Sequence, residues 1–223
     1  MGMPPPRCSC CYDEAFDADF AASELRHYRR RGPGRASKAL ADALSRPSVT
    51  GLTVLDIGGG VGAVHHLLLE RGAASATDVD ASSGYLAAAR EEAASRGLTD
   101  RITFHHGDFV ALAAEIEPAD LVALDRVGCC YPDIDALIGR AADHTRRRMA
   151  VTLPPDLLIA RGVIRVLNLW EWVTRSDLRI YGHSHERVRA AAVAAGLVPI
   201  SSTAVGSWRL LVFERPILTS DSR

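Results

Sequence analysis

The sequence predicts an α/β protein built on one doubly wound, mostly parallel sheet of seven strands. Between Thr53 and Leu153, short aliphatic runs alternate with helical segments, which indicates right-handed crossovers and a sheet covered on both faces. Near the C-terminus, strands expected at 198–204 and 208–214 are separated by only three residues. So short a connection makes the two strands antiparallel, and the last strand therefore runs against the others.

Composition and charge exclude several classes of function before any motif is considered. The chain has 223 residues, a formal net charge of −1 and a pI of about 6.7, so no overall positive field would attract nucleic acid. A hydrophobic content of 48% excludes a disordered chain. No apolar run is long enough to span a bilayer, and no signal-peptide core is visible. We therefore expect a soluble, cytoplasmic protein with a small-molecule substrate.

The expected elements follow the chain in order. Two helices, 15–31 and 36–44, are separated by a Gly-Pro-Gly break and form an N-terminal helical cap, residues 1–48. The cap precedes a main domain at 49–223. Its first five strands are expected at 53–57, 74–79, 102–105, 121–125 and 149–153. Its helices are expected at 64–71, 84–95, 110–114, 134–144 and 186–195.

A helical insertion is expected after the fifth strand, at 154–185. Residues 156–173 are strongly apolar, but Arg161 and Arg165 interrupt them, which excludes a membrane-spanning helix. The segment fits a hydrophobic lid over a substrate cavity, a peripheral membrane contact or a partner-docking face. A helix packed on the domain's own core is the equally weighted alternative.

The glycine-rich stretch Val54–Gly62 is the centre of the predicted site. A strand, a glycine turn and a helix place backbone N–H groups and a helix N-terminus at one point, where a nucleotide-like ligand can approach. Gly58, Gly60 and Ala63 also satisfy the dinucleotide pattern. Asp56, directly before the glycines, would repel a pyrophosphate and favours a cationic ligand instead.

Acidic residues end the next two strands. Asp80 follows the second strand, where a carboxylate can accept hydrogen bonds from both ribose hydroxyls. Gly107-Asp108-Phe109 ends the third strand, where a carboxylate can accept from an adenine amino group while an aromatic ring covers the base. The carboxyl ends of parallel strands are where ligands bind in such sheets.

Together these motifs resemble the Rossmann-like (class I) S-adenosylmethionine-dependent methyltransferases over Val54–Glu214. The stretch from Leu124 through Tyr131 to His183 is more narrowly similar to the magnesium-protoporphyrin O-methyltransferase branch. The resemblance implies S-adenosyl-L-methionine as the cofactor. It also implies a role for each motif residue. Gly58, Gly60 and Gly62 would admit the amino-acid end, Asp56 would act on its ammonium, Asp80 would hold the ribose, and Asp108 and Phe109 would meet the adenine.

Methyl transfer from a sulfonium is an in-line displacement, which depends mainly on proximity and exclusion of water. The acceptor approaches beside the loop after the fourth strand, which places Asp125 and Tyr131 near the reacting centre. Our candidate for a general base is His183, because an unperturbed imidazole titrates near neutral pH, but the alternative of a surface histidine that caps the following helix with Ser184 has slightly more weight. Tyr131 is the second catalytic candidate, with a pocket wall as its alternative role.

Tyr28 and Arg29 lie in the predicted cap. They could meet the cofactor's carboxylate if the cap closes over the site, as in related methyltransferases. The alternative is a solvated run of arginines at a helix C-terminus.

Five cysteines form two clusters, Cys8/Cys10/Cys11 and Cys129/Cys130. Neither has the C-x-x-C spacing of zinc sites, and we expect no metal. The resulting hypothesis is methyl transfer to a small apolar or aromatic acceptor, on oxygen. The alternatives are a methyltransferase-fold binding protein with a cysteine-bound metal or partner, and a nicotinamide-dependent oxidoreductase.

Overall fold

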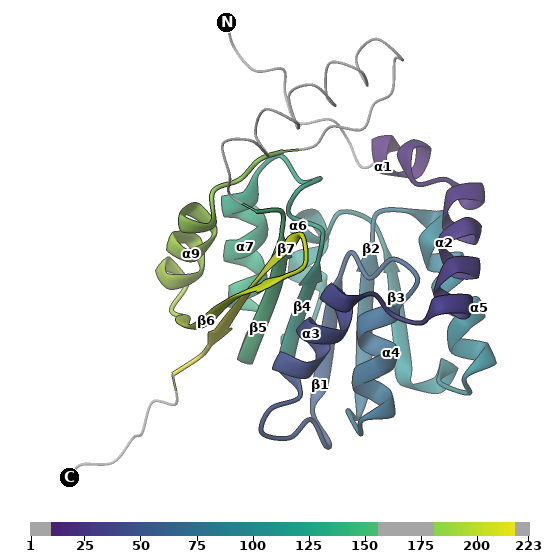
Figure 1. The fold of residues 1–223 in the computed structure, drawn as a ribbon, viewed down its shortest axis with the longest axis horizontal. Coiled ribbons are helices and arrows are strands. Elements are labelled where there is room, and N and C mark those ends of the chain that lie inside the picture. The colour runs from purple at the N-terminus through teal and green to yellow at the C-terminus, as the bar shows by residue number, and fades with distance from the viewer. Residues whose placement is uncertain (1–9, 156–180, 217–223) are drawn as a thin grey trace, which may run out of the picture.

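A seven-stranded sheet in the order β3-β2-β1-β4-β5-β7-β6 forms the centre of the protein (Figure 1). The computed structural model describes residues 10–155 and 181–216. The strands are β1 (Thr53–Ile57), β2 (Ser75–Asp80), β3 (Ile102–His106), β4 (Ala119–Asp125), β5 (Thr145–Leu153), β6 (Val198–Val205) and β7 (Trp208–Glu214). Strands β1 to β5 are parallel, and β7 is antiparallel to both of its neighbours. The predicted sheet is confirmed, including its antiparallel C-terminal strand.

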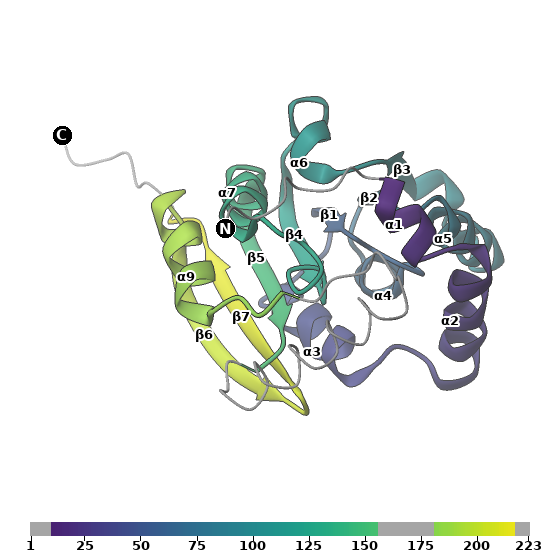
Figure 2. The same cartoon turned by 90° about the horizontal axis from the view of Figure 1, so that it is seen from above.

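Helices cover both faces of the sheet (Figure 2). One face carries α3 (Arg35–Leu44), α4 (Ala63–Glu70) and α5 (Ser83–Ser95), and the other carries α6 (Phe109–Leu112), α7 (Ile134–Asp143) and α9 (His185–Ala194). Two short 3₁₀ turns each connect a helix to the next strand: Thr99–Arg101 joins α5 to β3, and Ala113–Glu115 joins α6 to β4. Alternation along β1 divides the core: Leu55 and Ile57 face the α7 side, and Val54 faces α4.

The single helix predicted at 15–31 is wrong, because the chain turns at Asp17. The structure has α1 (Cys10–Ala15) and α2 (Ala18–Arg31) instead. Asp17 is extended and caps α2, its carboxylate accepting a hydrogen bond from the Phe20 N–H at 2.9 Å. The turn lets α2 run alongside α5 while α1 lies over the carboxyl ends of the strands (Figure 1).

The predicted boundary between a cap at 1–48 and the main domain stays a prediction. Helix α3 contributes Leu40 and Leu44, both fully buried, to the core that lies under β4 and β5. The predicted insertion falls largely at 156–180, outside the described residues. Within the described ranges, no helix is long and apolar enough to cross a membrane.

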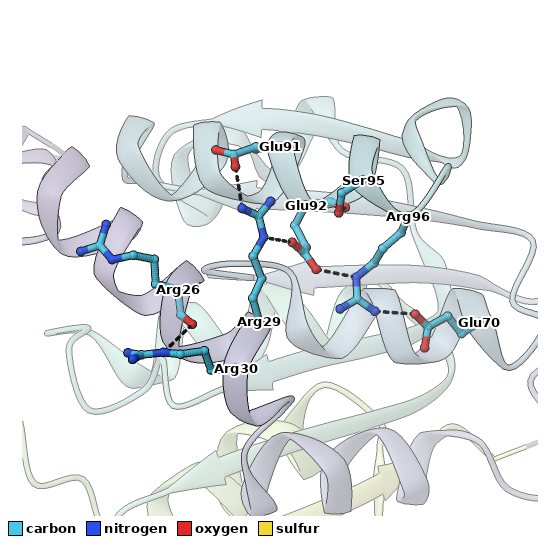
Figure 3. A network of polar contacts seen from close by, with 8 residues as sticks. All are labelled: Arg26, Arg29, Arg30, Glu70, Glu91, Glu92, Ser95 and Arg96. Carbon is cyan, nitrogen blue, oxygen red and sulfur yellow. Dashed lines mark hydrogen bonds and ion pairs between the residues drawn. The ribbon is translucent and has the colours of Figure 1, made fainter.

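An ion-pair network fixes α2 to α5 (Figure 3). The Arg29 guanidinium binds both Glu91 and Glu92 at 2.7 Å, and Arg96 binds Glu92 at 2.7 Å from the other side. Arg96 continues to Glu70 of α4 at 2.5 Å. Glu92 is only 3% exposed, whereas the Glu91 side chain is 63% exposed. Burial acts to raise the pKa of Glu92, but hydrogen bonds from the two arginines outweigh it and the pKa lies below its usual range.

Glu92→Gln should lower the free energy of unfolding by about 1–3 kcal/mol, because two charge-assisted hydrogen bonds lose their buried acceptor charge. Denaturant unfolding at pH 7 measures the loss. Because the folded-state pKa is depressed, the contribution of Glu92 is present above its unfolded pKa, about 4.3, and disappears as the pH falls through the lower folded value.

The matched control is Glu91→Gln, which removes an exposed partner of the same arginine and should cost less than about 0.5 kcal/mol. Equal losses in the two variants at pH 7 would contradict a structural role for the buried carboxylate.

Candidate active site

A cavity of about 390 Å³ opens at the carboxyl ends of the parallel strands. The glycine loop after β1 forms one wall, and the ends of β2, β3 and β4 form the floor. Helices α1 and α2 contribute aromatic side chains above the loop. The cavity therefore lies where the sequence predicted the site, with an additional wall supplied by the N-terminal helices.

The glycines of the loop serve two different purposes. Gly58 and Gly60 line the cavity and have positive φ angles of 65° and 58°. Gly62 also has a positive φ, 85°, but it begins α4 and does not line the cavity. A Cβ at Gly62 would lie 2.4 Å from His66 Cε1 and 2.6 Å from His65 Nε2. Gly62 is thus required by the histidines beneath the loop.

Asp80 connects β2 to the glycine loop. Its carboxylate accepts hydrogen bonds from the Gly60 N–H at 2.9 Å and the Ser82 N–H at 2.8 Å. Burial raises the pKa of the carboxyl, although these two hydrogen bonds oppose the shift. The residue lines the cavity, as predicted for a ribose-binding acid, and it also holds the loop in shape.

The predicted contact between Asp56 and a bound ammonium is not supported by the position of this side chain. Asp56 is 1% exposed and does not line the cavity. One of its oxygens accepts from the His65 backbone N–H at 3.3 Å and lies 2.9 Å from His65 Nδ1. Asp56 therefore lies beneath the loop, where His65, an unpredicted partner, holds it by hydrogen bonding.

Asp108 and Phe109 both line the cavity, with Tyr131 beside them. Asp108 caps α6 through the Val110 N–H at 2.9 Å, and the Tyr131 hydroxyl donates to its two oxygens at 3.0 and 3.1 Å. Burial and the neighbouring Asp108 raise the pKa of Tyr131, so this hydroxyl remains a donor. Each carboxylate oxygen keeps further acceptor capacity for a ligand.

Asp125 ends β4 at the cavity wall. The Thr152 hydroxyl donates to one of its oxygens and the Ser37 hydroxyl to the other, each at 2.6 Å. Neither hydroxyl residue was predicted from the sequence, because nothing in the pattern of α3 or β5 marks it. The next residue, Arg126, has a positive φ of 63°, which is strained for a side chain with a Cβ.

His183 does not line the cavity. Its Nε2 lies 2.8 Å from the Tyr131 carbonyl oxygen, and its ring stacks on Tyr181 with centroids 5.9 Å apart. Burial lowers the pKa of the imidazole. The α9 cap is the neighbouring Ser184, whose hydroxyl accepts from the Arg187 N–H at 3.2 Å.

The structure does not bring Tyr28 and Arg29 to the cavity. Tyr28 is 5% exposed, with its ring 6.4 Å from that of His66, and Arg29 is engaged by Glu91 and Glu92. The end of α2 therefore serves to fix this helix to the domain. Tyr28 and Arg29 miss the cavity because α2, which begins after the break at Asp17, packs along α5.

The aromatic wall above the glycine loop was only partly predictable. Phe16 and Phe20 are four residues apart in the helix predicted at 15–31, and their rings lie 5.7 Å apart. Phe16 also meets Tyr85 of α5 at 5.6 Å. Tyr12 completes this wall of Tyr12, Phe16, Phe20 and Tyr85. Trp208 of β7 lines the cavity as well, and no local sequence signal links it to Tyr12.

Gly62→Ala should destabilise the protein more than Gly60→Ala. Both substitutions place a side chain at positive φ, at a cost of about 1 kcal/mol. Only the Gly62 Cβ meets buried rings, whereas the Gly60 Cβ would lie at an ordinary 3.8 Å from Tyr85. Overpacking adds roughly 1–3 kcal/mol for Gly62→Ala. Denaturant unfolding of both variants measures the difference. Equal decreases in the free energy of unfolding would contradict the prediction, because they would mean that the His65 and His66 rings can move away from the new Cβ without cost.

Comparison with known proteins was made at the levels of sequence family and fold. Residues 54–148 match a family described as "Methyltransferase domain". No curated protein sequence matches the chain. The family match begins at the glycine-loop strand and includes Asp80, Asp108 and Asp125, and it gives no support to the oxidoreductase alternative.

Several solved structures share the fold. Magnesium protoporphyrin IX methyltransferase from Synechocystis PCC 6803, solved with bound S-adenosylhomocysteine, is 20% identical with a TM-score of 0.70, covering 93% of this chain and 99% of that one. A putative methyltransferase from Haloferax volcanii, solved with the Trm112 activator, is 18% identical with a TM-score of 0.69, covering 94% and 99%. An O-methyltransferase family protein from Burkholderia thailandensis is 20% identical with a TM-score of 0.69, covering 90% and 61%.

At these identities the structural likeness establishes the fold alone, and the family match over residues 54–148 supports a methyltransferase domain within it. The family match covers the glycine loop and the strand ends that line the cavity. Residues 54–148 thus match the methyltransferase-domain family, and the chain has the class I methyltransferase fold, which fits S-adenosyl-L-methionine as the cofactor.

Proposed function

We propose that this protein transfers the methyl group of S-adenosylmethionine to an oxygen of a small apolar or aromatic acceptor. The observation that carries the proposal is the aromatic wall of Tyr12, Phe16, Phe20 and Tyr85, which faces the same cavity as the glycine loop. Aromatic side chains favour flat, apolar ligands through area burial and ring contacts. The wall and the cofactor loop thus share one enclosed space.

The proposed cofactor position uses the residues that line the cavity. The amino-acid end lies at Gly58 and Gly60, the ribose at Asp80, and the adenine at Asp108 and Phe109. The positive φ of the two glycines and the free acceptor capacity of the two carboxylates support this arrangement. Asp125 lies at the far wall, held by two hydroxyls, near the point expected for the reacting centre.

Structural relatives support the acceptor class. The Synechocystis enzyme is a porphyrin methyltransferase, and an O-methyltransferase family 2 protein from Planctomyces limnophilus, 20% identical with a TM-score of 0.65, was solved in complex with apigenin. The porphyrin in the first enzyme's name and the apigenin bound to the second protein are both planar aromatic molecules. An acceptor of this kind is consistent with the apolar wall of the present cavity.

The geometry supports a positioning role for His183 beside Tyr131. With its Nε2–H donating to the Tyr131 carbonyl, the imidazole holds the loop that carries the cavity-facing ring. Tyr131 itself, with its raised pKa and its bond to Asp108, acts as a fixed hydrogen-bond donor at the wall. In-line methyl transfer then depends on alignment and exclusion of water, and an acceptor that arrives ionised needs no base.

Titration calorimetry with S-adenosylmethionine and with NAD tests the cofactor assignment. Wild-type protein should bind S-adenosylmethionine, and Asp80→Asn should weaken binding about tenfold or more, because a charged acceptor for the ribose is lost. Asp100→Asn, at an exposed residue remote from the cavity lining, is the control and should bind normally. Binding of NAD without S-adenosylmethionine would end the proposal.

Substitutions at His183 separate positioning from base catalysis. Gln can replace the Nε2–H donor, so His183→Gln should keep kcat/KM within about threefold, while His183→Ala should lose about tenfold, the value of one buried hydrogen bond. Because burial lowers the pKa of His183, its ring stays neutral below the usual value near 6.5, so wild-type protein and His183→Gln should show kcat/KM profiles of the same shape from pH 7 to 8, set by ionisation of the acceptor. Assays with a phenolic acceptor measure both. Equal inactivity of the two variants would instead identify a base.

A further inference from the structure

The proposed cofactor position leaves the charged amino-acid end of S-adenosylmethionine without partner side chains. Asp56 lies beneath the glycine loop, and Tyr28 and Arg29 lie away from the cavity. The amino-acid end carries an ammonium and a carboxylate, and burying either charge without a partner costs free energy. Two side chains that line the cavity, Glu24 and Arg126, carry the complementary charges and have no role in the proposed cofactor position.

Glu24 brings a carboxylate to the cavity from α2. It lies one helical turn after Phe20, and both residues line the cavity. The arginines of α2 do not neutralise Glu24, because none of them is three or four residues away from it. Among residues 10–155 and 181–216, no hydrogen bond or ion pair engages this carboxylate. Its charge is therefore available to a ligand.

Arg126 brings a guanidinium to the cavity from the end of β4. Among the described residues that line the cavity, it alone is positively charged. Its Nε lies 3.4 Å from a carboxylate oxygen of Asp125, and the other N–H donors of the planar fork remain for a second carboxylate. The next residue, Val127, packs against the glycine loop, since a Cβ at Gly58 would lie 2.5 Å from its Cγ2. Arg126 is thus placed beside the loop.

The charges of Glu24 and Arg126 converge on Tyr85, a ring beside the same loop. A Cβ at Gly60 would lie 3.8 Å from this ring. Burial raises the pKa of the Tyr85 hydroxyl, the negative charge of Glu24 raises it further, and the positive charge of Arg126 opposes the shift. The carboxylate and the guanidinium therefore both lie close enough to the glycine loop to act on one phenol.

We propose that Glu24 and Arg126 bind the amino-acid end of S-adenosylmethionine at two points. Glu24 accepts hydrogen bonds from the ammonium, and Arg126 donates hydrogen bonds to the carboxylate. The inference rests on the proposed cofactor and adds the residues that select its amino-acid end. Because the two contacts have opposite charge, only one orientation of that end satisfies both, and this orientation helps to fix the direction of the methyl group.

Calorimetry with three thioethers separates the two contacts. S-adenosylhomocysteine has the ammonium and the carboxylate, its decarboxylated analogue has the ammonium alone, and methylthioadenosine has neither. All three have an uncharged sulfur atom, so the sulfonium does not affect the comparison. Glu24→Gln should weaken binding of the first two ligands about tenfold and leave methylthioadenosine within about twofold. Arg126→Gln should weaken S-adenosylhomocysteine about tenfold and leave the other two within about twofold.

Asp19→Asn and Arg26→Gln are the matched controls. They remove the same charges from exposed positions of α2 that do not line the cavity, and all three affinities should stay within about twofold. Circular dichroism and thermal unfolding report whether each variant folds. If Arg126→Gln does not fold, wild-type protein decides. It should bind the decarboxylated analogue about tenfold more weakly than S-adenosylhomocysteine, and methylthioadenosine more weakly still.

Three results would overturn the inference. Unchanged affinity for S-adenosylhomocysteine in either Gln variant would do so and leave the cofactor assignment standing. Equal losses for all three ligands in a folded variant would mean that the side chain acts on the shape of the cavity and not on the amino-acid end. Equal wild-type affinities for the three ligands would show that neither charge is recognised. Wild-type protein that binds neither S-adenosylmethionine nor S-adenosylhomocysteine would overturn the proposed cofactor as well.

Discussion

The parallel register of β1 and β2 is the constraint on which the site depends. It pairs Asp56 with Asp78, two carboxylates side by side under the glycine loop, and places Asp80 at the end of the same strand. Three acids so close cannot all remain charged in a buried environment. Burial, followed by the nearby charge of Asp56, raises the pKa of Asp78 and favours its neutral form. Asp56 keeps His65 as its partner, and Asp80 reaches the cavity and the glycine loop.

The histidines of α4 are a consequence of the same constraint. His65 and His66 are completely buried, and burial lowers the pKa of His66 to about 2, so its ring is neutral. Only a glycine at position 62 leaves room for both rings beneath the loop. The loop therefore takes its shape from below as well as from the cofactor side: Asp80 holds Gly60 from one direction, and the histidine pair fills the space under Gly62.

The sequence predicted the sheet because its signals are local and repetitive. Aliphatic runs, glycine breaks and a three-residue connection predict where the strands lie and in which direction they run, whereas the order of the strands came only from the structure. The side-chain contacts that complete the site are not local. Ser37 and Thr152 meet at Asp125 from α3 and β5, and no spacing along the chain encodes that meeting. The break at Asp17 was hidden because an N-cap aspartate also fits an exposed helical position.

The sequence predicted that Asp56 makes the site favour a cationic ligand over a pyrophosphate. The cavity does have a mostly acidic lining, but other residues provide it. His65 removes Asp56 from the cavity, yet the charged side chains lining it are four carboxylates and one guanidinium, from Glu24, Asp80, Asp108, Asp125 and Arg126. A dianionic pyrophosphate would be repelled there, whereas a sulfonium with a nearby ammonium would be attracted. Selectivity for a cationic cofactor thus belongs to the ends of several strands and not to a single acid. This selectivity does not require Asp56 to contact the cofactor, because the parallel sheet brings the acidic ends of several strands to one edge.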